Sequence, residues 1–225
     1  TYQVGTGFSG SAVVSPALKA LTGQVDLAFT GDKLSGSGDF DVDLPLVRGA
    51  KVHVDYKDGK FEGSSTIEPG AFDVPNIAVT SSSIQATFGE EFTIGGSAAV
   101  SMAGGLVTGS LALTYAAKKL DASVDSTFSV PGLKPVGLHL AYVGGKLKGS
   151  AQTTVALPYA DSAGIEIYYR NGKFGGKGKV GFDVPFLNHV DGQVELTEEG
   201  KVNGALTIKP NALQIPPLSV EGASI

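Results

Sequence analysis

The chain has 225 residues, a formal net charge of −5 and no Cys. Its lysines are scattered evenly among the acids, so no basic stripe follows a phosphate backbone and nucleic acid is not expected as a partner. The lack of Cys excludes disulfides, thiolate metal sites and cysteine nucleophiles.

The chain begins Thr1-Tyr2, without Met or a signal peptide. We therefore expect a fragment of a longer array, residues 1–225 forming a single repeat domain. The 32 glycines are about twice the usual share of about 7%, which suits strands and turns. The only helix expected is one turn at residues 15–20, with Ser15 as cap and Pro16 at the first position.

An internal repeat of about 27 residues organises the sequence. The last apolar residue before each predicted turn stands at Phe29, Tyr56, Phe88, Tyr115, Tyr142, Tyr169 and Leu196. Successive members lie 27, 32, 27, 27, 27 and 27 residues apart. The repeats are placed near 1–22, 23–49, 50–81, 82–108, 109–134, 135–162, 163–189 and 190–225.

Each repeat is predicted to be an antiparallel β-hairpin. Asp-Gly and Asn-Gly between alternating strands are typical of type I′ turns, which need positive φ at both central residues. The predicted turn residues are Asp58, Gly59, Gly144, Gly145, Asn171, Gly172 and, in a longer loop, Gly200.

Alternate residues of each hairpin divide into an apolar and a polar face, as a half-buried strand pair requires. The predicted apolar face includes Phe29, Leu34, Val54, Tyr56, Phe61, Phe88, Leu113, Tyr115, Leu140, Tyr142, Ile167, Tyr169 and Phe174. Two residues after the first apolar position of each return strand comes a small residue, such as Gly63 or Gly149. We expect these small residues to serve packing against larger partners across the pair.

Chemical motifs are few. Asp39, Asp41 and Asp43 place three carboxylates on one strand face, a weak candidate for Ca²⁺, but the Gly and distal Glu of an EF-hand loop are absent. The alternative is a solvated acidic row paired with Lys on a neighbouring strand. The three histidines, His53, His139 and His189, are interpreted as surface residues. No motif indicates a catalytic site or a cofactor, and we expect no enzyme activity.

The fold class predicted is an all-β antiparallel up-and-down meander of about 14–16 strands. It would shelter its apolar face as a closed or flattened barrel, with a β-sandwich or an extended sheet as alternatives. Two aromatic rows on the apolar face also resemble the girdles of an outer-membrane barrel, so a pore-forming transmembrane β-barrel stays open.

The unit φ-x-φ-x-Tyr-x-Asp/Asn-Gly-Lys-Phe-x-Gly, together with the connector Val130 to Leu133, resembles tandem β-hairpin repeats of very large bacterial secreted proteins. Those proteins belong to polymorphic-toxin or contractile-injection-associated systems. The resemblance is one of repeat style, and it implies a structural or cargo-housing segment that is extracellular or secreted. It carries over no functional residue.

The first functional hypothesis is therefore a non-enzymatic scaffold, spacer or shell with an apolar interior that encloses hydrophobic cargo. Its partners would be flanking repeats of the same polypeptide and apolar cargo or lipid. The alternatives are the pore-forming barrel, located in the outer membrane, and a lipid-binding barrel.

Overall fold

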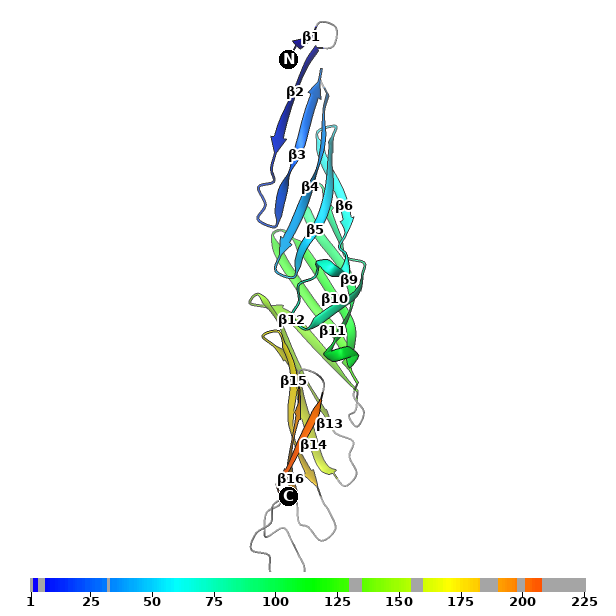
Figure 1. Cartoon of the computed structure of the whole chain (residues 1–225), viewed down its shortest axis with the longest axis vertical. Coiled ribbons are helices and arrows are strands. Elements are labelled where there is room, and N and C mark those ends of the chain that lie inside the picture. The colour runs from blue at the N-terminus through cyan, green and yellow to red at the C-terminus, as the bar shows by residue number, and fades with distance from the viewer. Residues whose placement is uncertain are drawn as a thin grey trace, which may run out of the picture. The chain divides into compact units, whose positions relative to one another are not determined.

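The computed structural model describes residues 2–3, 7–31, 33–129, 135–154, 160–182, 190–197 and 201–207 (Figure 1). In these ranges the regular elements are β-strands and two short 3-10 turns, η1 (Pro69–Ala71) and η2 (Ala103–Gly105). The all-β antiparallel meander predicted from the sequence is confirmed. The expected helical turn at residues 15–20 is wrong, because Leu21 N donates to Leu18 O in a non-helical turn instead. No described helix is long and apolar enough to cross a membrane.

The strands follow one another along the chain with short connections. The first nine are β1 (Tyr2–Gln3), β2 (Gly7–Val14), β3 (Leu21–Thr30), β4 (Lys33–Leu44), β5 (Val47–Lys57), β6 (Lys60–Thr66), β7 (Ile77–Ser82), β8 (Gln85–Phe88) and β9 (Phe92–Met102). The others are β10 (Val107–Ala116), β11 (Lys119–Phe128), β12 (Val136–Val143), β13 (Lys146–Thr154), β14 (Ala160–Arg170), β15 (Lys173–Phe182), β16 (Val190–Leu196) and β17 (Val202–Thr207).

Sequence neighbours pair antiparallel. The ladder runs from β2 through β3, β4 and β5 to β6, and from β11 through consecutive strands to β17. One interruption explains the single 32-residue step of the repeat. The segment between Tyr56 and Phe88 contains η1 and β7, so that β6 pairs with β8.

The contacts divide the chain into two compact units. Unit 1 consists of Thr1–Val74, Val79–Val100 and Leu111–Ala122. Unit 2 consists of Pro75–Ala78, Ser101–Ser110 and Ser123–Ile225.

The core of unit 1 is built from one face of its hairpins. In β5, Val52 and Val54 are fully buried, whereas the intervening His53 is exposed. Aromatic rings continue this interior: Phe88 lies 5.5 Å from Phe40 and 6.3 Å from Phe92 between ring centroids. Because tilted aromatic pairs at such distances attract beyond simple burial, the series stabilises neighbouring hairpins against one another.

The core of unit 2 follows the same rule. Val124, Leu140 and Ile167 are fully buried at alternate positions of their strands. The rings of Phe128 and Phe174 lie 5.8 Å apart, and both side chains are covered. Period-two burial of this kind is what an antiparallel sheet with one sheltered face produces.

The apolar-face residues differ in how far they are covered. Val54, Leu113, Tyr115, Leu140, Ile167, Tyr169 and Phe174 are buried, Tyr56, Phe61, Phe88 and Tyr142 are half-buried, and Phe29 and Leu34 are exposed. The last pair stands directly opposite each other at the start of the β3–β4 hairpin. The Phe29 ring lies against Gly10 of β2, where an added Cβ would overlap it, yet both side chains stay partly exposed. Alternation alone therefore does not bury these two side chains.

The turns have the backbone that their residues favour. Positive φ occurs at Asp58 and Gly59, at Gly144 and Gly145, and at Asn171 and Gly172. Gly200 lies outside the described residues, and its loop is closed at the edges by Thr197 N donating to Lys201 O at 2.8 Å.

Candidate functional site

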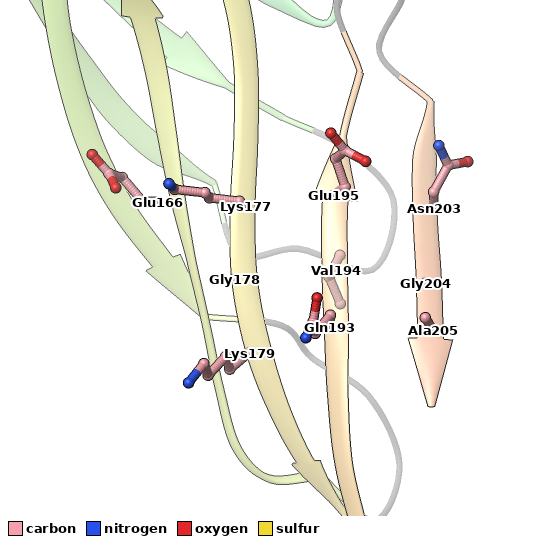
Figure 2. Close-up of a pocket in the computed structure, with 10 residues that line it drawn as sticks. All are labelled: Glu166, Lys177, Gly178, Lys179, Gln193, Val194, Glu195, Asn203, Gly204 and Ala205. Carbon is pink, nitrogen blue, oxygen red and sulfur yellow. The ribbon is translucent and has the colours of Figure 1, made fainter. Parts of the chain in front are cut away.

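An open hollow lies on the polar face of β14 to β17, within unit 2 (Figure 2). Its volume is about 710 Å³ and it is open to solvent. The strand register sets its composition: Glu166 stands opposite Lys177, Lys177 opposite Glu195, and Glu195 opposite Asn203. Charges of alternating sign therefore cross three strands in one row, which continues on the fourth strand as the uncharged amide of Asn203.

A second row lies beside the first. Lys179 stands opposite Gln193, which in turn stands opposite Ala205. Figure 2 shows Lys177 and Lys179 extending from β15 toward the side of β14. Opposite charges on adjacent strands stabilise a sheet by a few tenths to about 1 kcal/mol per pair, so this face has a structural explanation that needs no ligand.

Next to this hollow, Arg170 is the last residue of β14. Its Nη2 donates to Glu166 Oε1 at 2.6 Å, and its guanidinium lies 5.1 Å from the ring centroid of Tyr168. Both arrangements use residues on one polar face of one strand. The described groups here are ion pairs and amides, and none of them is a nucleophile hydrogen-bonded to a base.

Two His–Asp pairs occupy equivalent places in the repeat. His53 Nδ1 lies 2.7 Å from Asp39 Oδ1, and His139 Nδ1 lies 2.6 Å from Asp125 Oδ1. Both pairs join directly opposed residues of adjacent strands. The sequence placed both histidines on the polar face, but their partners were missed. The repeated spacing of 14 residues between Asp and His is the signal that would have found them.

The electrostatics of the first pair are those of a surface ion pair. The hydrogen bond to Asp39 raises the pKa of His53, opposed by partial desolvation, and Asp55 adds a smaller attraction. All three side chains are more than half exposed. His189 lies outside the described residues.

The acidic row on β4 does not converge on a metal site. Its three members face three different partners across the β4–β5 pair, because Asp39 stands opposite His53, Asp41 opposite Lys51, and Asp43 opposite Arg48. Within the described residues no three His, Cys, Asp or Glu groups come together to hold a metal ion. The register agrees with the solvated, cation-paired interpretation of this row.

A smaller, more apolar pocket lies in unit 1 where hairpin turns meet a connector. Leu18, from the β2–β3 connection, lines it together with Phe88, Phe92 and Tyr115. Its volume is about 260 Å³, below the range of about 300–1,000 Å³ typical of small-molecule sites.

Unit 2 also contains a contact between a connector, at Pro75 and Asn76, and the β14–β15 turn. The Tyr169 hydroxyl donates to Pro75 O, and Asn76 Nδ2 donates to Gly172 O at 2.6 Å. The connector thereby covers the β14–β15 turn, and Tyr169 is only 1% exposed. Burial raises the pKa of Tyr169 to about 12.

Comparisons with family models, curated proteins and solved structures return no match.

Proposed function

We propose that the chain is a non-enzymatic structural repeat domain, a scaffold or spacer whose hairpins pack on their own apolar face. The observation that carries this proposal is the segregation of chemistry between the faces. Val54, Leu140, Ile167 and their equivalents lie in the interior, whereas the described Asp, Glu, Lys, Arg and His side chains lie on polar faces, and several of them stand opposite a group of the other sign across strands. Such an arrangement uses its charges for register and solubility.

The described polar residues give no support to a catalytic assignment. The described partners of His53 and His139 are Asp carboxylates on exposed strand faces, and not nucleophilic side chains. The polar hollow on β14–β17 consists of complementary charges and amides on neighbouring strands. Catalytic constellations need a nucleophile or acid–base group positioned on a reacting atom, and none of these groups has that geometry.

The direction of the apolar face favours a packed scaffold over the pore-forming barrel. A membrane barrel turns its apolar side chains to lipid, but Val52, Val54 and Leu111 are fully covered by protein here. The pocket at Leu18 is a described space of a size that a small apolar group could enter. A lipid-carrying role remains the second candidate because that pocket is lined by aromatic rings.

Purification of the chain without detergent tests the proposal. We expect a folded β protein by circular dichroism, with no acyl chains in an organic extract measured by mass spectrometry. Aggregation that detergent relieves, together with conductance in planar bilayers, would support the pore instead. Stoichiometric acyl chains in the extract would support the lipid carrier.

A further inference from the structure

The pocket beside the β8–β9 turn combines aromatic and acidic residues. Phe88, Phe92 and Tyr115 form its aromatic wall, and Glu90 and Glu91 of the turn line it as well. All five residues belong to unit 1. The volume of about 260 Å³ suits a ligand smaller than those of typical small-molecule sites. A ligand in this pocket would therefore be small, and it would meet rings and carboxylates together.

The aromatic wall is held in place by packing. Phe92 and Tyr115 are 5% and 8% exposed, and their ring centroids lie 5.8 Å apart. Phe88 lies 6.3 Å from Phe92 and 5.5 Å from Phe40 between ring centroids. Successive rings along the wall are tilted by 42° and 52°, so they do not share one plane. Because the wall is preformed, a ligand does not have to order it on binding.

This lining favours one chemical class of ligand. The face of an aromatic ring carries negative electrostatic potential and attracts a cation within about 6 Å of the ring centroid. Glu90 and Glu91 add formal negative charge, and both residues are exposed. A methylated ammonium group matches both features, because its methyl groups suit the rings and its charge suits the carboxylates. An acyl chain would match the rings alone.

One lining residue opposes this selection. Lys118, in the β10–β11 turn, is exposed and also lines the pocket. Its ammonium offsets one of the two glutamate charges, which leaves an excess of negative charge around the space. Removal of this lysine should therefore strengthen the binding of a cation, whereas it should leave the binding of an uncharged ligand as it was.

We propose that this pocket binds a methylated ammonium group. The rings of Phe88, Phe92 and Tyr115 receive the methyl groups, and Glu90 and Glu91 balance the charge. Two sources carry this group: a small free molecule such as choline, and the headgroup of phosphatidylcholine in a membrane. A binding site of this kind goes beyond the scaffold role and does not depend on it.

Calorimetric titration of the full chain tests the selection for a cation. Choline is compared with 3,3-dimethylbutan-1-ol, in which carbon replaces the ammonium nitrogen and the shape is kept. We expect choline to bind about tenfold more tightly, as attraction by aromatic rings and carboxylates together implies. Equal binding of the two compounds would overturn the proposal, because it would show a pocket that selects only for apolar shape.

Charge variants locate the site, and each is compared with the same neutral analogue. Glu90→Gln combined with Glu91→Gln should weaken choline binding about two- to fivefold, and Lys118→Gln should strengthen it by a similar factor. Glu62→Gln is the matched control, because Glu62 is an exposed glutamate of unit 1 on β6. An equal loss in the control would overturn the assignment to this pocket.

The aromatic wall has its own variant. Phe88 is half-buried, and Phe88→Leu keeps an apolar side chain there while it removes a ring. In a chain that circular dichroism shows to be folded, this change should weaken choline about threefold or more and leave the neutral analogue unchanged. An equal loss for both ligands would overturn the role of the ring.

Vesicle sedimentation separates the two sources of the cation. If the headgroup is the ligand, the chain should sediment with phosphatidylcholine vesicles and not with phosphatidylglycerol vesicles, and free choline should compete. If a small molecule is the ligand, choline should bind and neither kind of vesicle should. A folded chain that binds neither choline nor phosphatidylcholine would overturn the site, yet would leave the scaffold role intact.

Discussion

Asn76 donates its side-chain amide to the backbone carbonyl of Gly172, 2.6 Å away and 96 residues further along the chain. Tyr169 makes the parallel bond to Pro75 O. Non-local contacts of this kind connect a connector to a hairpin turn within unit 2, where the ladder hydrogen bonds join only neighbouring strands. These two hydrogen bonds hold the connector and the hairpin together within one packed unit.

Removing either bond should lower stability. Tyr169→Phe deletes a buried hydroxyl donor and leaves Pro75 O without that partner, and we expect a loss of about 1 kcal/mol in the free energy of unfolding. Tyr168→Phe is the control, since its ring lies on the polar face beside Arg170. Urea unfolding measures both variants, and equal losses would contradict the assigned role of the Tyr169 hydroxyl.

The ionisation of Tyr169 gives an independent check on that contact. Its pKa of about 12 in the folded chain exceeds the ordinary value of 10.0. A raised folded pKa stabilises the protein below the unfolded value, and this contribution is lost as pH rises from about 10 through 12. Ultraviolet absorbance of the phenolate should therefore show one Tyr titrating late, and Tyr169→Phe should remove that step.

Certain glycines allow strand backbones to approach one another closely. A Cβ added at Gly38 would overlap Gln24 O and lie 2.8 Å from Val25 Cα. Gly95 is also in a strand, but an added Cβ there would meet nothing within 4 Å. We expect Gly38→Ala to destabilise by about 1–3 kcal/mol and Gly95→Ala to stay within about 0.5 kcal/mol. Chemical denaturation measures the free energy of unfolding of both variants. Similar losses in the two variants would show that packing does not require Gly38.

Much of the fold follows from local sequence because the hairpin is a local structure. Period-two alternation around Val52 and Val54 predicts the buried face, and Asn171-Gly172 predicts its turn from the backbone requirement alone. The division into two units could not be predicted. It depends on contacts such as Tyr169 with Pro75, between residues whose sequence separation carries no periodic signal.

The polar face was predictable in position but not in pairing. Alternation placed His53 and Asp39 on exposed faces, yet which side chains meet depends on register across the β4–β5 connection, where a bulge shifts the ladder between Val42 and Asp43. A one-residue change in register would reverse the faces of a strand. The hollow on β14–β17 likewise exists only through the alignment of four strands.

The β10–β11 turn adopts a strained backbone. Ala117 has φ 49° and Lys118 has φ 63°, a region that costs residues with a Cβ about 1–2 kcal/mol. Changing this pair to Asn-Gly should raise the free energy of unfolding by about 1 kcal/mol, because Asn-Gly favours the type I′ turn. Gly145→Ala, at a turn position with φ 80° and open space, should lower it by a similar amount. Thermal unfolding measures both, and stabilisation by both substitutions would contradict the backbone argument.

The His53–Asp39 pair predicts a pH effect of defined sign. Because the hydrogen bond to Asp39 raises the pKa of His53 above 6.5, the pair contributes stability below the unfolded value, and the contribution is lost as pH rises through the folded one. Asp39→Asn removes the acceptor charge and should return the pKa toward 6.5, which a histidine titration followed by NMR measures. Asp41→Asn is the control, since Asp41 stands opposite Lys51 instead. An equal fall in the pKa of His53 in both variants would mean that the overall charge, and not the contact with Asp39, raises this pKa.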